Sequence, residues 1–214
     1  MFLQYSTDYG LNHQGNPELK PEKLYGLDIG YNYDNLSSVR LSINTFYYLY
    51  DDMIDFVYAL PVIAKNRTDI SSSGIETNFH FDLNTEWKLN FGYTYLNVDD
   101  INNIDPILYR PEHKFISKIV YQRGNTNNML VFNFRSKQDY QDFLSDNYEF
   151  VDNEIRFPIK KMDSLLLMDY IGTYQLKDVN ISLKIANIFD IQYELIQDYP
   201  MPGRTINVGF EKFF

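Results

Sequence analysis

The side chains that could perform catalysis are few, and none stands in the spacing of a known catalytic motif. The three histidines, His13, His80 and His113, are far apart, and no H-E-x-x-H pair occurs. G-x-S-x-G, a phosphate-binding P-loop and a dinucleotide fingerprint are also missing. A hydrolase built on strands would need a Ser–His pair on neighbouring strands, and the sequence does not place one. We therefore expect no enzymatic activity.

Metal binding is the second chemistry to consider. The chain contains no cysteine, which excludes a disulfide framework, a thiolate metal site and a thiol nucleophile. Oxygen ligands for calcium could come from Asp99, Asp100 and Asp105, which fall in an expected loop. Their spacing does not match the D-x-[DN]-x-[DN]-G pattern of a calcium loop, so a solvated acidic loop is favoured. We expect neither a metal nor a cofactor.

Net charge and hydropathy exclude further classes of protein. With 19 Lys and Arg against 29 Asp and Glu, the formal charge of −10 argues against a nucleic-acid partner. The longest apolar run, FVYALPVIA at 56–64, contains a proline and is about half of the ~20 residues that a membrane-spanning helix needs. The first residues have neither the basic start nor the apolar core of a secretion signal. Either the protein is not exported or this sequence lacks its beginning.

The elements that must position the polar residues are strands, because apolar residues alternate with small or polar ones along almost the whole chain. In 179–186, for example, Val, Ile, Leu and Ile alternate with Asn, Ser, Lys and Ala. The alternation is equally clear in 25–34, 75–83 and 87–95, and weaker in 38–50, 112–123, 128–138, 163–176 and 204–214. The sequence therefore predicts an all-β fold with about nine strands of roughly 10–14 residues, which is long for strands.

The connections between these strands alternate between short and long. Short turns are expected at 35–37, 84, 124–127 and 177, and long loops at 51–69, 99–111, 139–162 and 190–203. An antiparallel up-and-down sheet with tight turns at one rim and long loops at the other has this rhythm. In bacterial outer-membrane barrels the tight turns are periplasmic and the long loops extracellular. The pattern therefore favours a transmembrane β-barrel.

The composition of the two strand faces separates a membrane barrel from a soluble one. A soluble calyx or sandwich should carry many Lys and Glu residues on its outer face, whereas the polar face here is mostly Gly, Asn, Ser, Thr and Asp. Short polar side chains suit a water-filled lumen, and Tyr, Phe, Leu and Ile suit a lipid-facing surface. About nine strands would leave two unpaired edges, which hydrocarbon does not tolerate. We expect an incomplete barrel, with a soluble all-β binding module as an alternative.

Several separated motifs carry a resemblance to a known family. They are NPELKPE at 16–22, YLYDDMIDFV at 48–57 followed by Asn66, SSSGIETNFHF at 71–81, RPEHK at 110–114 and NIFDIQYELIQDYPMPGRTINVGFEKFF at 187–214. In this order and spacing they resemble the TonB-dependent outer-membrane receptors, and the resemblance covers essentially the whole chain.

The resemblance implies a function and a place in a larger protein. Members are 22-stranded barrels filled by an N-terminal plug domain. They import scarce ligands such as ferric siderophores or cobalamin with energy passed on by TonB. Residues 1–214 would be the C-terminal part of such a barrel, without the plug, the TonB-contact segment and the first strands. The expected partners are outer-membrane lipid, the barrel-assembly machinery, the TonB complex through the absent N-terminal part, and a small metal chelate or vitamin. A passive porin-like channel is the first alternative.

Aromatic residues in the expected long loops are candidate walls of a ligand site at the barrel mouth. They are Tyr140, Phe143, Tyr148, Phe150, Tyr193 and Tyr199. Anchoring at the membrane–water boundary is an equally good interpretation, since tyrosine favours that region. Arg204 is a further candidate, either shaping the last turn together with Pro202 and Gly203 or pairing with a carboxylate in the lumen. For Asn187 and Asp190 we favour a turn-forming role over a ligand-binding one.

The end of the chain resembles the signal that the barrel-assembly machinery reads in this family. The resemblance assigns this role to Ile206, Val208, Gly209, Phe210 and the terminal Phe214. Lys212 departs from the pattern, because the residue two positions before the end is usually hydrophobic or aromatic. The alternative is that these residues simply face lipid in the last strand.

Overall fold

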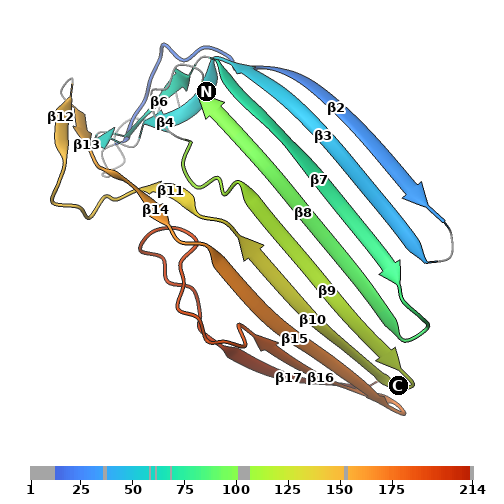
Figure 1. Cartoon of the computed structure of the whole chain (residues 1–214). Coiled ribbons are helices and arrows are strands. Elements are labelled where there is room, and N and C mark those ends of the chain that lie inside the picture. The colour runs from blue at the N-terminus through green and yellow to red at the C-terminus, as the bar shows by residue number, and fades with distance from the viewer. Residues whose placement is uncertain are drawn as a thin grey trace.

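The computed structural model describes residues 13–35, 38–57, 59–60, 62–67, 69–100, 107–151 and 154–212. In these ranges no helix combines the length and apolar character needed to cross a membrane. One sheet of nine long strands dominates the molecule (Figure 1). Its strands are β2 (Lys23–Asp34), β3 (Val39–Asp51), β7 (Ile70–Asp82), β8 (Trp87–Asp100), β9 (His113–Arg123), β10 (Thr126–Arg135), β15 (Leu165–Leu176), β16 (Val179–Ala186) and β17 (Thr205–Lys212).

The long strands are arranged as an up-and-down antiparallel sheet. Their order is β17-β16-β15-β10-β9-β8-β7-β3-β2. Each strand pairs with the long strand before and after it in the chain, except that β2 and β17, at the two edges, each pair with one. Figure 1 shows the short turns at the lower right, here called the turn end, and the long connections at the upper left, here called the loop end. The predicted fold class, strand number and alternation of connections are confirmed.

The last two strands follow the predicted alternation. β16 spans Val179–Ala186, one of the ranges in which the sequence alternates most clearly, and β17 is described over Thr205–Lys212, with residues 213 and 214 outside the described residues. β16 ends at Ala186 because Asn187 adopts a positive φ of 52°, a left-handed conformation that interrupts an extended strand. The buried Asn187 side chain then closes a turn by bonding both backbone groups of Ile191. The interpretation of Asn187 as a turn residue is confirmed.

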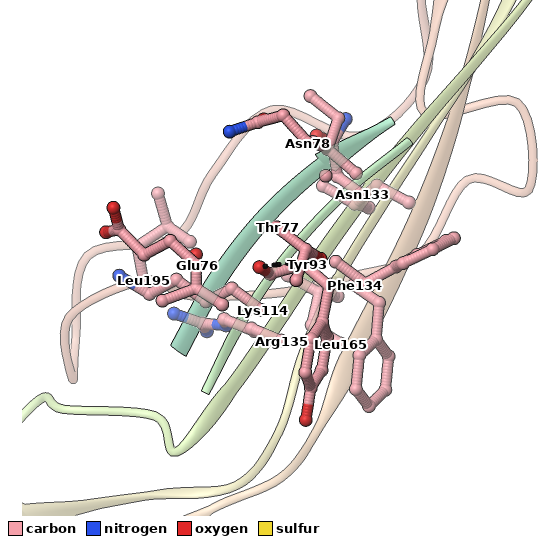
Figure 2. Close-up of a pocket in the computed structure, with 15 residues that line it drawn as sticks. Glu76, Thr77, Asn78, Tyr93, Lys114, Asn133, Phe134, Arg135, Leu165 and Leu195 are labelled. Carbon is pink, nitrogen blue, oxygen red and sulfur yellow. Dashed lines mark hydrogen bonds between the residues drawn. The ribbon is translucent and has the colours of Figure 1, made fainter. Parts of the chain in front are cut away.

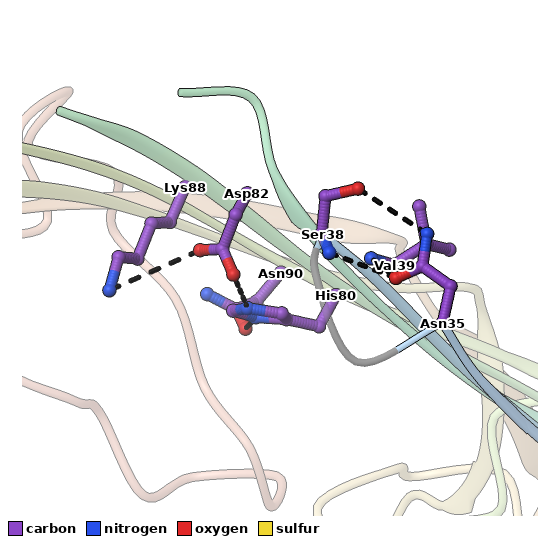
Figure 3. A network of polar contacts seen from close by, with 7 residues as sticks. All are labelled: Asn35, Ser38, Val39, His80, Asp82, Lys88 and Asn90. Carbon is purple, nitrogen blue, oxygen red and sulfur yellow. Dashed lines mark hydrogen bonds and ion pairs between the residues drawn. The ribbon is translucent and has the colours of Figure 1, made fainter. Parts of the chain in front are cut away.

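The short turns at 84, 124–127 and 177 lie where the sequence predicts them, and the turn predicted at 35–37 is described only at Asn35, because residues 36 and 37 lie outside the described residues. Asn35 and Asn84 each accept two backbone N–H groups through Oδ1, at 2.8–2.9 Å, which is the Asx geometry that reverses a chain. Gly124 and Lys177 supply left-handed residues, with φ of 55° and 48°. Figure 3 shows Asn35 near a polar network at the turn end, in which His80 lies between Asp82 and Asn90.

The long connections contain short strands that the sequence did not predict. β1 (His13–Gln14), β4 (Met53–Val57) and β6 (Val62–Arg67) form one small sheet, and β11 (Gln138–Gln141) and β14 (Ile159–Met162) form a hairpin. β12 (Glu149–Val151) and β13 (Glu154–Arg156) form another hairpin, and β13 pairs with β5 (Ala59–Leu60). The connections at 51–69 and 139–162 are therefore joined by backbone pairing.

The segment 16–22 is held by side chains at the loop end. Asn66 accepts the Lys20 N–H and donates to the carbonyl oxygens of Lys20 and Asp52. Glu22 accepts the Ile54 N–H, and Leu19 is buried. NPELKPE and Asn66, which carried part of the resemblance, are thus linked by contacts that fix the approach to β2.

The two faces of the sheet differ as the alternation predicted. Tyr25, Leu27, Ile29 and Tyr31 of β2 lie on one face with 59–63% of their surface exposed. Gly26, Asp28 and Gly30 lie between them, on the face called here the polar face. Only five apolar side chains in the described residues are buried: Leu19, Ala64, Ile70, Val131 and Leu165. The opposite, apolar face therefore has no protein layer over it in the described part of the chain, and it suits lipid better than water.

Candidate ligand site at the loop end

A pocket of about 430 Å³ lies at the loop end, between the β11–β14 hairpin and the connection that follows β16. We call it the loop pocket. Tyr140 and Lys161 come from the hairpin, Tyr193 and Glu194 from the connection, and Arg135 from the end of β10. Two of the predicted ligand residues, Tyr140 and Tyr193, are thus brought together although they are far apart in sequence.

The polar side chains of the loop pocket are of mixed character: two cations and two phenols lie beside the carboxylates of Asp163 and Glu194. The Lys161 ammonium lies 3.1 Å from an Asp139 carboxylate oxygen, but its side chain remains 69% exposed. The Glu194 carboxylate accepts the Asp198 N–H at 2.9 Å and is used within its own connection. The Asp163 carboxylate lies 3.1 Å from the Lys137 ammonium and is 88% exposed. The two phenols and the accessible Lys161 ammonium are the groups that can donate to anionic or carbonyl oxygens of a ligand.

A second pocket, of about 530 Å³, lies on the polar face beside the first. We call it the face pocket. Glu76, Lys114 and Asn133 line it from neighbouring strands, and Leu195 covers it from the connection. Figure 2 shows Glu76 and Leu195 on one side of the sheet and the rings of Tyr93 and Phe134 on the other. Arg135 and Leu165 line both pockets.

Three other predicted ligand residues form a separate aromatic cluster beyond the hairpin. Phe143 and Tyr148 pack on Phe157 with ring centroids 5.3 and 6.3 Å apart, and Tyr148 contacts Phe150 at 5.7 Å. Phe150 is 72% exposed. None of these three lines the loop pocket or the face pocket. They lie on an outer surface of the connection 142–158.

Tyr199 and Arg204 lie at the edge of the site. Tyr199 is exposed and precedes Pro200, which lines the loop pocket. The Arg204 backbone N–H donates to Asp190 Oδ1 at 2.7 Å, and its guanidinium lies 3.6 Å from Asp190 Oδ2. Asp190 has a positive φ of 55°. This pair therefore shapes the turn that leads into β17.

The acidic residues considered for calcium lie in a different setting from the one expected. The sequence predicts a loop at Asp99 and Asp100, but they are the last residues of β8, because Ile70 and Ser71 of β7 pair with them. Asp100 is buried and lies 3.9 Å from Arg67. Asp105 lies outside the described residues. Within the described ranges, no group of three acidic or histidine side chains is placed to hold a metal ion.

The residues assigned to the assembly signal lie on the edge strand β17. Ile206, Val208 and Phe210 are 60–74% exposed on the apolar face. At Gly209 a side chain would lie on the polar face, where an added Cβ would be 2.5 Å from the Ser182 hydroxyl. Phe214 lies outside the described residues. The exposed apolar row suits both recognition during assembly and contact with lipid.

The sequence did not single out Arg135, Gln138 or Lys161. The alternation predicts that Arg135 lies on the polar face. A cation at the end of a strand is usually solvated, so this position alone does not indicate a role. Lys161 lies in a connection without periodicity, so only its pairing with Asp139 in the hairpin register places it at the pocket.

The connection 142–158 is anchored by an ion pair, which predicts a pH dependence. The hydrogen bond from Lys160 lowers the pKa of the Asp142 carboxyl, and the same bond raises the pKa of Lys160. A lowered carboxyl pKa stabilises the folded connection above the ordinary Asp pKa, and this contribution is lost as the pH falls through the lowered value. The contribution of Lys160 is lost at the other end, as the pH rises through its raised pKa.

We therefore expect proteolysis within 142–158 to accelerate in acid below the ordinary Asp pKa. Replacing Lys160 with Gln should make cleavage faster already at neutral pH, and the further acceleration in acid should shrink. Limited proteolysis across a pH series measures both effects. Lys137→Gln is the control, since Lys137 pairs with Asp163 outside this connection. Identical pH profiles for the native protein and Lys160→Gln would contradict the role of the pair.

Comparison with known proteins places this arrangement in a family. The family model described as TonB dependent receptor-like, beta-barrel matches residues 2–188. The iron-regulated outer membrane virulence protein of Vibrio cholerae serotype O1 is 23% identical over 232 residues, which cover 96% of this chain and 33% of that protein. The chain thus spans about a third of the length of this curated relative.

Solved structures show the same fold. The copper transporter OprC superposes with a TM-score of 0.73 at 17% identity, over 92% of this chain and 32% of that one. The siderophore receptor PirA from Acinetobacter baumannii also gives 0.73, at 19% identity, over 94% of this chain and 33% of that one. Because the family match covers most of the sequence and the sheet has the fold of these barrels, the chain belongs to the TonB-dependent receptor β-barrel family and lies in the bacterial outer membrane.

Proposed function

We propose that the chain forms part of the wall of an outer-membrane receptor that takes up a metal chelate, foremost a ferric siderophore, with energy passed on by TonB. The observation that carries the proposal is the loop pocket, where Tyr140, Tyr193 and Lys161 meet at the end of the sheet with the long connections. Phenol and ammonium donors suit a ligand rich in anionic oxygens. Of the three similar proteins named above, one is iron-regulated, one is a siderophore receptor and one is a copper transporter, and these names support a metal-containing ligand, foremost iron, over cobalamin.

We further propose that residues 1–214 are the C-terminal part of the barrel. Within the described residues, β2 and β17 each have one neighbour in the long sheet, and unpaired strand edges are unfavourable in hydrocarbon. The remaining strands, the plug and the TonB-contact segment would then belong to other parts of the whole receptor. Lipid would cover the apolar face, and the assembly machinery would recognise the last strand.

Uptake by the whole receptor tests this function. Iron-limited cells that express it should accumulate radiolabelled ferric chelate with saturation, and accumulation should fall to background in cells without TonB. Replacing both Tyr140 and Tyr193 with Ala should weaken binding by roughly tenfold or more, because buried aromatic contacts often dominate an interface.

Tyr148→Ala separates the pocket from the outer aromatic cluster. Tyr148 lies in that cluster and does not line the loop pocket, so this variant should bind nearly as well as the native receptor. Uptake that continues without TonB would instead favour the passive channel. Unchanged binding in the double tyrosine variant would reject the loop pocket as the ligand site.

A further inference from the structure

The loop pocket and the face pocket meet at one short boundary. Arg135 and Leu165 line both, whereas Glu194 lines only the loop pocket and Leu195 only the face pocket. The boundary is therefore made by the end of β10, the start of β15 and the segment 191–200. Whatever passes from the loop end to the polar face beside this segment must pass these residues.

Two side chains tie the segment 191–200 to this boundary. The Arg135 guanidinium donates to the backbone carbonyl oxygen of Glu194 and lies 3.2 Å from the Met162 sulfur. The Gln138 amide donates to the carbonyl oxygen of Leu195 at 3.3 Å and lies 3.5 Å from the same sulfur. Gln138 is 5% exposed. These two hydrogen bonds, here called the ties, are accepted by backbone carbonyl oxygens of the segment. They therefore fix the position of its backbone independently of its side-chain conformations.

The segment 191–200 is closed on itself. Glu194 and Pro200 form an isolated antiparallel bridge, and the Met201 N–H donates to the Tyr193 carbonyl oxygen at 3.0 Å. At its base, Asp190 is held by Arg204. A segment closed at its base and bonded within itself moves as one piece, so its contacts with Arg135 and Gln138 decide where that piece lies.

The position of Arg135 gives the tie a second role. Arg135 is directly opposite Lys114 in the β9–β10 register, and like charges in opposite positions are unfavourable. The Glu194 carbonyl oxygen offsets this repulsion while the tie is made. Release of the tie leaves Arg135, at the boundary, opposite Lys114, which lines the face pocket.

We propose that Arg135 and Gln138 are positioning residues that hold the segment 191–200 across the passage between the loop pocket and the face pocket. Release of the segment joins the two pockets. This inference depends on the proposed function in one respect: a ligand would move through the passage. The experiment that tests it requires neither a ligand nor TonB.

Single cysteines report on the passage, because the native chain contains none. Leu167→Cys places a thiol at a position that lines the face pocket alone, and Gln192→Cys at one that lines the loop pocket alone. The rate of reaction with a maleimide that cannot cross the outer membrane is measured from outside, on cells that express the whole receptor. With the native ties in place, the thiol at position 167 should react slowly and the thiol at position 192 fast.

Replacing Arg135 with Met keeps a long side chain but removes its donors. Labelling at position 167 should then accelerate by roughly tenfold or more, as the loss of a charged hydrogen bond implies, while the rate at position 192 stays unchanged. Gln138→Met removes the second tie and should give a smaller rise in the same direction. The amount of protease-resistant receptor in the outer membrane shows that each variant is folded.

Fast labelling at position 167 with both ties intact would overturn the proposal, as would an unchanged rate in both variants. An equal acceleration at positions 167 and 192 would also overturn it, because that result indicates general loosening. If labelling changes as expected but the native receptor takes up no ferric chelate, the proposed function fails and the positioning role stands.

Discussion

Replacing Leu183 with Arg is expected to cost about 2–4 kcal/mol of stability in the membrane, the range for a cation facing lipid near the bilayer midplane. Leu183 lies on the apolar face in the interior of β16, opposite Gly172 of β15 and Val208 of β17. A charged group there would face lipid, and the polar group beside Gly172, the Tyr170 hydroxyl, already donates to Asn128. The amount of folded receptor in the outer membrane, and its unfolding midpoint in urea after purification, measure the loss.

Ser182→Arg is the matched control, one residue earlier on the same strand. Ser182 lies on the polar face opposite Gly209 and Thr173, and the glycine leaves space beside it. An arginine there can extend over the polar face, so stability should change by less than about 1 kcal/mol. Equal losses in the two variants would contradict the assignment of the faces.

Replacing Gly74 with Ala is expected to destabilise the barrel by about 1–3 kcal/mol, the usual cost of overpacking. A Cβ at this position would overlap the backbone carbonyl oxygen of Tyr95 and lie 2.6 Å from the Phe46 ring. The ring can rotate, but the carbonyl belongs to the β7–β8 ladder and cannot move without breaking it. Denaturant unfolding of the purified receptor measures the difference.

Gly30→Ala is the control for Gly74, because both glycines lie on the polar face. A Cβ at Gly30 would have its nearest neighbour, Asn44 Oδ1, at 3.5 Å, which is an ordinary contact. Its effect should stay within about 0.5 kcal/mol. If Gly74→Ala were equally mild, the close approach of β7 and β8 would not require glycine.

The long strands could be predicted because each contains several periods of alternation. In β2 the tyrosines and aliphatic residues repeat on one face over 12 residues, which defines the register. The short strands in the connections contain 2–6 residues, too few for a period to be recognised. The end of β8 was misplaced for a related reason: Asp99 and Asp100 look like loop residues, and only pairing with β7 makes them strand residues.

The candidate site could be predicted only in part. Tyr140 and Tyr193 were selected as loop aromatics, and folding brings them to one pocket. Phe143 and Tyr148 were selected on the same grounds, but the structure packs them on Phe157. The amino-acid composition of a loop cannot separate the aromatic residues that line the pocket from those that pack on Phe157, because it does not indicate which connections contact each other. The partner of Arg135 is the backbone carbonyl oxygen of Glu194. Every residue has such a carbonyl, so the sequence does not indicate which one Arg135 contacts.

The pairing of β13 with β5 has a consequence for receptor engineering. Ile155 and Arg156 pair with Leu60 and Ala59, so the surface connections at 51–69 and 139–162 share one small sheet. A chimaera that takes only one of them from another receptor would replace one or two of the three strands of that sheet and leave strand edges that no longer match. Grafts intended to transfer recognition between receptors should therefore exchange both connections together.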